Sequence, residues 1–173
     1  MGKYLSLKFG AAGKLRKEEL HFLKLKFYAL DRDKSGQISV DEFKQITSIA
    51  NNPLLERVIH VFDKDNNGEV DFEEFVNGIA IFAHEGYKKR KLKFLFQIYD
   101  INKDGYICHD ELFDLLKLVM EKDVPDLDIH QIVHKTIWLN DKDGDQKLSF
   151  KEFYNCIESI LDANLKAGIK ILS

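Results

Sequence analysis

The sequence predicts an all-α protein of four helix–loop–helix units, arranged in two paired lobes. A twelve-residue pattern rich in Asp, Asn and Glu occurs four times in the 173 residues, and apolar residues at helical spacing flank each copy. Position 8 of each copy is apolar, which predicts short strand pairing between adjacent loops. We expect Ile38 to pair with Val70, and Ile107 with Leu148.

The second copy of the pattern, DKDNNGEVDFEE at residues 63–74, matches an EF-hand calcium loop at every position. Such a loop takes oxygen ligands from positions 1, 3, 5 and 9, a backbone carbonyl from position 7 and a bidentate Glu from position 12. The predicted ligands are Asp63, Asp65, Asn67, Glu69, Asp71 and Glu74. Gly68 supplies the sharp turn at position 6, and four anionic ligands predict tight calcium binding.

The first and third copies, DRDKSGQISVDE at 31–42 and DINKDGYICHDE at 100–111, follow the same spacing with fewer ideal ligands. The predicted ligands of the first loop are Asp31, Asp33, Ser35, Gln37, Ser39 and Glu42. Those of the third loop are Asp100, Asn102, Asp104, Tyr106 and Glu111. Cys108 occupies position 9 of the third loop and is a poor ligand for a hard cation, so we expect water there.

The fourth copy, DKDGDQKLSFKE at 141–152, departs from the pattern at the turn. Its predicted ligands are Asp141, Asp143, Asp145, Lys147 through its carbonyl, and Glu152. Gln146 replaces the glycine of position 6, where a left-handed conformation costs roughly 1–2 kcal/mol and so about an order of magnitude in affinity. The four carboxylates of this loop act in the opposite direction, because they favour calcium binding. Because every loop ends in Glu, the sequence favours calcium over magnesium, with up to four Ca²⁺ ions bound.

Helical apolar spacing orders the rest of the chain around these loops. The stretches that enter the loops are Leu20–Leu30, Leu55–Phe62, Leu92–Tyr99 and Leu127–Ile137, and those that leave them are Phe43–Ile46, Phe72–Phe82, Leu112–Val119 and Phe153–Leu161. We therefore predict a basic arm at 1–18, a first lobe at 19–83, a polar linker at 84–90, a second lobe at 91–161 and a tail at 162–173.

Composition excludes several classes of function. The chain is 45% hydrophobic and 32% charged, has no apolar stretch near 18 residues and shows no secretory h-region after Met1, so we expect a cytoplasmic location. Its carboxylates are spaced for one cation, so we expect neither catalysis nor a nucleic-acid partner. Cys108 and Cys156 lack metal or disulfide spacing. His109 and His134 show no recognised ligand spacing and are expected to be exposed or partly packed.

The first residues predict a lipid modification. Met1, Gly2 and Ser6 form the pattern M-G-x-x-x-S, which predicts N-myristoylation of Gly2. One acyl chain anchors a protein only marginally, so the basic residues of the arm would supply a second, electrostatic contact with a peripheral membrane surface. Two alternatives remain open: a solvated basic arm, and an acyl chain that packs against the protein itself.

The helix that leaves the third loop carries the predicted partner-binding residues. Leu115, Leu116, Val119 and Met120 would form one wall of an apolar groove for a partner helix, with core packing as the alternative. The chain holds only 2 Met, whereas promiscuous calcium sensors line their grooves with adaptable methionines. A dedicated partner fits this composition better.

Three stretches are specific beyond a generic EF-hand: NPLLERVIHVFDKDNNGEVDFEEF from Asn51, KLKFLFQIYDINKDGYI from Lys91, and QIVHKTI with DKDGD from Gln131. Over residues 20–161 the chain resembles the calcineurin B family, the regulatory subunits of the calcium/calmodulin-dependent protein serine/threonine phosphatase. The resemblance implies a non-catalytic, two-lobed protein that clamps an amphipathic helix of the catalytic subunit. It also implies support for a surface where substrates and immunophilin–drug complexes dock. Gln146, Cys108 and the stretch 9–20 depart from that pattern.

Three other functions remain open on the sequence alone. A myristoylated membrane-switching sensor of the recoverin type would share the acyl motif, although such proteins usually carry a disabled first loop and residues 31–42 are intact. A calcium buffer of the parvalbumin type would expose little apolar surface. A calcineurin-B-like cofactor of a membrane transporter would share most of these sequence features.

Overall fold

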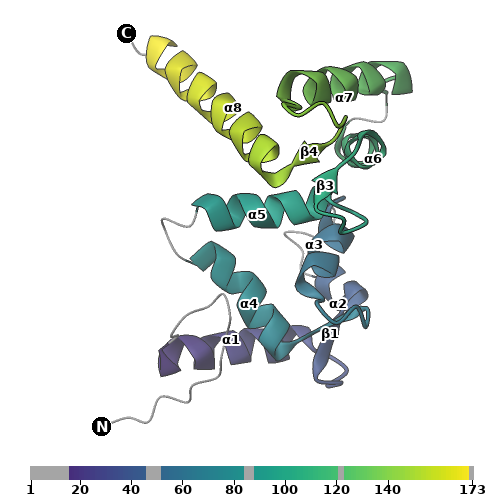
Figure 1. The fold of residues 1–173 in the computed structure, drawn as a ribbon. Coiled ribbons are helices and arrows are strands. Elements are labelled where there is room, and N and C mark those ends of the chain that lie inside the picture. The colour runs from purple at the N-terminus through teal and green to yellow at the C-terminus, as the bar shows by residue number, and fades with distance from the viewer. Residues whose placement is uncertain (1–15, 46–51, 84–87, 121–122, 172–173) are drawn as a thin grey trace. The chain divides into compact units, whose positions relative to one another are not determined.

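The computed structural model describes residues 16–45, 52–83, 88–120 and 123–171, with the backbone alone for 82–83 and 161–171. The chain forms two compact units, residues 1–91 and 92–173 (Figure 1). Each unit contains helices and one small antiparallel sheet within these ranges, which confirms the predicted all-α class with paired loops. None of the described helices is long and apolar enough to cross a membrane.

The elements follow the predicted order. Those of the first unit are α1 (Lys17–Leu30), β1 (Gln37–Ser39), α2 (Val40–Lys44), α3 (Leu55–Phe62), β2 (Glu69–Asp71) and α4 (Phe72–Ala83). Helix α5 (Lys88–Tyr99) begins in the last residues of the first unit and continues into the second. The second unit also contains β3 (Tyr106–Ile107), α6 (His109–Val119), α7 (Asp126–Asn140), β4 (Leu148–Ser149) and α8 (Phe150–Ile171).

The predicted strand pairing is confirmed in both units. Ile38 lies opposite Val70 in the β1–β2 pair, and Ile107 lies opposite Leu148 in the β3–β4 pair. Three of these side chains are 0% exposed and Leu148 is 2% exposed. The contact therefore removes apolar surface from water and ties the two loops of each unit together.

The same aromatic cluster recurs in both cores. In the first unit the Phe27 ring packs edge-on against Phe72 and Phe75, with ring centroids 5.4 and 5.6 Å apart. The second unit repeats this with Phe96 at the centre and Phe150 and Phe153 each at 5.5 Å. Each central Phe precedes a loop by one helical turn, and its two partners lie at position 10 of the other loop of the same unit and directly after that loop. This packing therefore joins the helix that enters one loop to the helix that leaves the other.

Some helix bounds differ from those predicted. Helix α5 begins at Lys88, inside the predicted linker 84–90, because Lys88–Lys91 contains good helix formers and no Gly or Pro. The backbone of α8 continues to Ile171 through most of the predicted tail, which contains no proline. The end of the helix at Ile46 lies outside the described residues, as does Gly2.

The buried face of α7 also differs from the predicted one. Ile129, Val133 and Ile137 face the core of the second unit, as their four-residue spacing allows. Leu127 and Ile132, which were predicted to share the same apolar stripe, are 67% and 41% exposed. Helix α7 therefore has an apolar face toward the core and separate apolar residues toward solvent.

Gly78 in α4 lies against the ring of Phe62 at the end of α3. A Cβ at this position would stand 2.5 Å from Cε2 and Cζ of that ring, and Phe62 is buried. We predict that Gly78→Ala lowers the free energy of unfolding by about 1 kcal/mol or more, because overpacking costs about 1–3 kcal/mol and outweighs the helix-propensity gain of about 0.5–1 kcal/mol. Urea denaturation measures this difference.

The matched control is Gly78→Ala in a Phe62→Leu background. The smaller side chain leaves room for the added methyl, so the cost of the alanine should shrink in a double-mutant cycle. Equal costs in both backgrounds would contradict the predicted clash.

Candidate metal centres

Each of the four loops holds two residues in the left-handed backbone region. At position 6 these are Gly36, Gly68, Gly105 and Gln146, with φ of 88°, 90°, 89° and 63°. At position 4 they are Lys34, Asn66, Lys103 and Gly144, with φ of 61°, 58°, 60° and 81°. Every loop thus contains one glycine and one non-glycine residue with positive φ. The glycine is at position 6 in the first three loops and at position 4 in the fourth. The expected positive φ of Gln146 is confirmed.

The turn at position 6 directs a backbone N–H at the first ligand of each loop. The N–H of Gly68 donates to Oδ2 of Asp63 at 2.9 Å, and that of Gln146 donates to Oδ2 of Asp141 at the same distance. Gln146 therefore makes the bond that glycine makes elsewhere, and the substitution keeps the shape of the loop. The bond from Gln146 is the main reason that the pKa of Asp141 lies below its usual range. Burial opposes this effect, and the N–H of Gly144 adds to it.

The position-12 glutamate of each loop is buried and held by backbone donors. In the second loop, Oε1 of Glu74 accepts the N–H of Lys64 at 2.7 Å and Oε2 accepts that of Asp71 at 3.0 Å. The equivalent glutamates accept equivalent bonds: Glu42 from Arg32 and Ser39, Glu111 from Ile101 and Cys108, and Glu152 from Lys142 and Ser149. Both carboxylate oxygens are thereby oriented before any cation binds.

In the first and fourth loops these bonds also favour the charged form of the glutamate. Burial alone would raise the pKa of Glu42, but the N–H groups of Ser39 and Arg32 outweigh it and hold the pKa below its usual range. Burial likewise opposes the N–H of Lys142 and the Ser149 hydroxyl at Glu152, whose pKa is also lowered. Both side chains are therefore anionic at neutral pH, as a cation ligand must be.

The described residues fit a hard cation. Three sets of carboxylate oxygens lie within 4.8 Å of one another: Asp31 with Asp33 and Glu42, Asp63 with Asp65 and Glu74, and Asp141 with Asp143 and Asp145. Oδ1 of Asp31 and Oδ1 of Asp100 are buried without a hydrogen-bond partner. A buried, unpaired carboxylate oxygen is costly, and a bound cation would offset that cost in the first and third loops. The donors are oxygens, which suit calcium.

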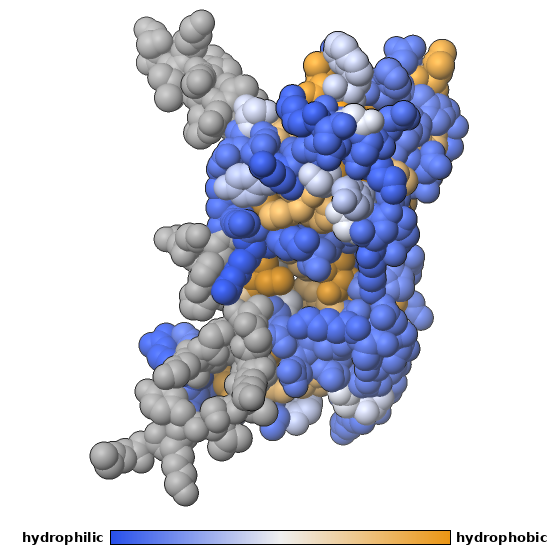
Figure 2. Space-filling model, in the orientation of Figure 1, coloured by the Kyte–Doolittle hydropathy of each residue, from blue (hydrophilic) through white to orange (hydrophobic). Residues whose placement is uncertain are grey.

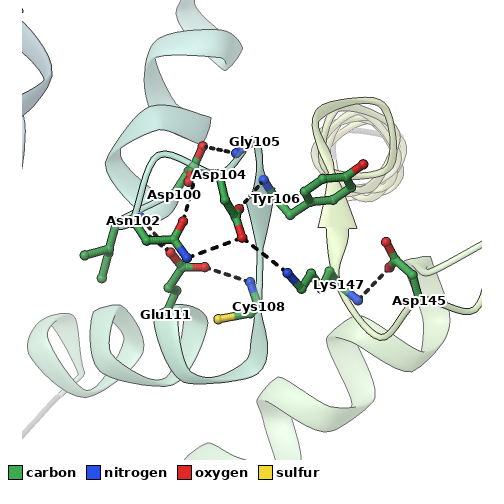
Figure 3. A network of polar contacts seen from close by, with 10 residues as sticks. Asp100, Asn102, Asp104, Gly105, Tyr106, Cys108, Glu111, Asp145 and Lys147 are labelled. Atoms are coloured by element: carbon green, nitrogen blue, oxygen red, sulfur yellow. Dashed lines mark hydrogen bonds and ion pairs between the residues drawn. The ribbon is translucent and has the colours of Figure 1, made fainter.

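The third loop is built differently from the others (Figure 3). Its Cys108 contributes a backbone N–H to Glu111 at 2.9 Å, and burial raises the pKa of the thiol. A neutral thiol is a poor calcium ligand, in line with the expectation from sequence. Burial also raises the pKa of Asp100, whose carboxylate accepts the N–H of Gly105 at 3.0 Å.

Sequence reasoning missed one contact of the third loop, which comes from the ammonium of Lys147 in the fourth loop. Lys147 Nζ lies 3.2 Å from Oδ2 of Asp104 although the two residues belong to different loops (Figure 3). The N–H of Tyr106 and this ammonium hold the pKa of Asp104 below its usual range. Strand pairing across the loops could have indicated the contact, because it brings position 7 of the fourth loop beside the third.

The four predicted partner-binding residues differ in exposure. Leu115 is 3% exposed and belongs to the core, whereas Val119 is 45% exposed. Leu116 and Met120 are partly buried against the core of the second unit. Leu118, which lies outside the predicted apolar stripe of α6, is 47% exposed.

Comparison with known proteins agrees with this geometry. A family model described as an EF-hand domain pair matches residues 21–80 and 89–158. The paired loops and this match define an EF-hand protein whose metal is Ca²⁺.

Similar proteins of known family show which group of EF-hand proteins the chain belongs to. The chain is 48% identical over 143 residues to the calcineurin B protein of Candida glabrata, covering 83% of this chain and 82% of that protein. It is 48% identical over 136 residues to the type 2 calcineurin B protein of Homo sapiens (79% and 80%), and 46% identical over 136 residues to the calcineurin B protein of Yarrowia lipolytica (79% and 79%). The chain belongs to the calcineurin B family, which confirms the resemblance found in the sequence.

The exchanged glycine of the fourth loop gives a direct test of backbone strain. We predict that Gln146→Gly raises the calcium affinity of this loop by up to about tenfold, because it removes roughly 1–2 kcal/mol of left-handed strain. A calcium titration followed through the amide resonance of residue 146 measures the affinity.

Gly68→Gln in the second loop is the converse control. A Cβ there would meet no atom within 4 Å, so only the backbone conformation, at φ +90°, opposes the glutamine. The calcium affinity of the second loop should therefore fall in Gly68→Gln. If Gln146→Gly leaves the calcium affinity of the fourth loop unchanged or lowers it, left-handed strain does not weaken that loop.

The Lys147 ammonium competes with a cation for Asp104. We predict that Lys147→Met raises the calcium affinity of the third loop by up to about fivefold, since an exposed ion pair contributes about 0–1 kcal/mol. The gain should shrink at high salt. Titration followed at the Gly105 amide measures it, and Gln37→Met at the same position of the first loop is the control. A lower affinity would mean that Lys147 supports the site.

Proposed function

We propose that this chain is the calcium-binding regulatory component of a calcineurin-type serine/threonine phosphatase. It clamps an amphipathic helix of the catalytic chain, stabilises that chain and makes its activity depend on calcium. The observation that carries the proposal is the identity of 48% to calcineurin B proteins of two organisms. In this assignment the chain described here is not catalytic, and the phosphatase chemistry belongs to its partner.

Calcium binding is assigned to all four loops with the ligands predicted from sequence. The backbone bonds to each position-12 glutamate support this assignment, since they orient a bidentate ligand. The unpaired oxygens of Asp31 and Asp100 support it for the first and third loops.

Exposed apolar side chains in the second unit support a protein partner. Six large ones on α6 and α7 are 41–73% exposed: Leu118, Val119, Leu127, Ile132, Trp138 and Leu139. Hydrophobic atoms break the hydrophilic surface over α7, at the top right of Figure 2. Exposed apolar surface of this kind is typical of an interaction site, whereas a protein that only buffers calcium is expected to expose little of it.

Two finer parts of the proposal concern location and further partners. We place the complex in the cytoplasm, with peripheral membrane contact through a myristoylated Gly2 and the basic arm. The same assembly would support the docking of substrates and immunophilin–drug complexes. The sequence pattern M-G-x-x-x-S supports the lipid.

Val119 is the predicted partner residue that can be changed without disturbing the core. We predict that Val119→Asp weakens the affinity for the phosphatase catalytic chain about tenfold or more, because it places a charge in an apolar contact. The melting temperature of the free protein should not change, since the side chain is 45% exposed. Binding is measured with the purified catalytic chain in calcium.

Gln97→Asp is the matched control, because it adds the same charge at an exposed position of α5, outside the apolar surface of α6 and α7. Equal binding by both variants would remove Val119 from the interface. Calcium-dependent purification of the unmodified protein from its own cell, with the bound protein identified, tests the function itself. Recovery of no phosphatase catalytic chain would contradict it.

A further inference from the structure

Three histidines gather where α6 meets α7 in the second unit. His109 begins α6, and His130 and His134 lie four residues apart on the solvent side of α7. The rings of His109 and His130 stack nearly parallel, with centroids 5.2 Å apart and an interplanar angle of 13°. Without His130, the sequence shows no ligand spacing in this region. With it, α7 carries a pair of imidazoles one helical turn apart.

A cavity connects the third histidine of the group, His134, with His109. His109 and His134 line one cavity of about 390 Å³ together with Trp138, Asp141 and Gln146. His109 therefore stacks on one histidine of α7 and lines the same cavity as the other. None of the three belongs to the predicted calcium ligands.

We propose that His109, His130 and His134 form a binding site for a divalent transition-metal ion such as Zn²⁺. Histidines at i and i+4 on one helix face can ligate the same ion, and imidazole is a preferred ligand of zinc, copper and nickel. The third histidine raises the ligand number to three. The site is distinct in chemistry from the loops, which offer hard oxygen donors.

The side chains next to His130 and His109 affect the binding of an ion in opposite ways. Phe113 stacks on His130 with centroids 4.1 Å apart, a contact that His130 would have to give up to bind an ion. Nδ1 of His109 lies 3.3 Å from Oδ1 of Asp110, which leaves Nε2 for an ion. A carboxylate behind a metal-binding histidine fixes its orientation and raises its basicity.

The site is not closed around an ion as it stands. Among the described residues, no three donor atoms of this cluster lie within 4.8 Å of one another. Binding therefore requires rotation of the side chains of His134 and His130, both of which are exposed. The cost of that rotation makes the site weaker than a preformed structural zinc site.

Zinc titration of the full chain in excess calcium tests the proposal, because calcium then occupies the loops. We expect one equivalent of Zn²⁺ to bind by calorimetry. His130→Gln or His134→Gln should lower the affinity by more than about tenfold, and Asp110→Asn by about tenfold through the lost orientation of His109. Co²⁺ in place of Zn²⁺ should give visible absorption bands that His130→Gln removes.

Two control variants make the result specific. His60→Gln changes an exposed histidine of the first unit and should leave zinc binding unchanged. Cys108→Ser removes the nearby thiol and should also leave it unchanged. No zinc binding in calcium, binding unaffected by the α7 variants, or binding lost in Cys108→Ser would each overturn the proposal. Circular dichroism of every variant establishes that α7 remains folded.

Discussion

The buried glutamate at position 12 of each loop is the contact on which the rest of the structure depends. Glu74 belongs to α4, yet it accepts N–H groups from the start of its loop and from the adjoining strand. A helix that leaves a loop is thereby attached to the backbone that enters it. Because the same carboxylate would contact a cation with both oxygens, we expect a bound ion to strengthen the attachment of the leaving helix to the loop.

Strand pairing and aromatic packing carry that connection to the other loop of the unit. Ile38 and Val70 join the two loops of the first unit through the backbone, while Phe27 joins α1 to the start of α4. The second unit repeats both contacts with Ile107, Leu148 and Phe96. A change at either loop therefore moves a shared core, so the two calcium sites of a unit should be energetically coupled.

Much of this arrangement could be predicted from the sequence, because the ligands, the turn and the apolar position 8 are fixed by spacing within each loop. Contacts between elements were harder to predict. The ammonium of Lys147 reaches Asp104 from 43 residues away, and His109 meets His130 only because α6 and α7 pack together. The exposure of Leu127 and burial of Leu115 likewise depend on which face of a helix meets the core, which spacing alone leaves ambiguous when apolar residues surround the helix.

The exchange of glycine between positions 4 and 6 of the fourth loop limits the order in which such a loop can change by mutation. A loop with glycine at both positions has no strained residue, so it is an accessible intermediate between the two arrangements. A loop with glycine at neither position would hold two strained residues, at a cost of roughly 2–4 kcal/mol. If the fourth loop descends from one like the other three, a gain of Gly144 before the loss of glycine at position 146 avoids this doubly strained form.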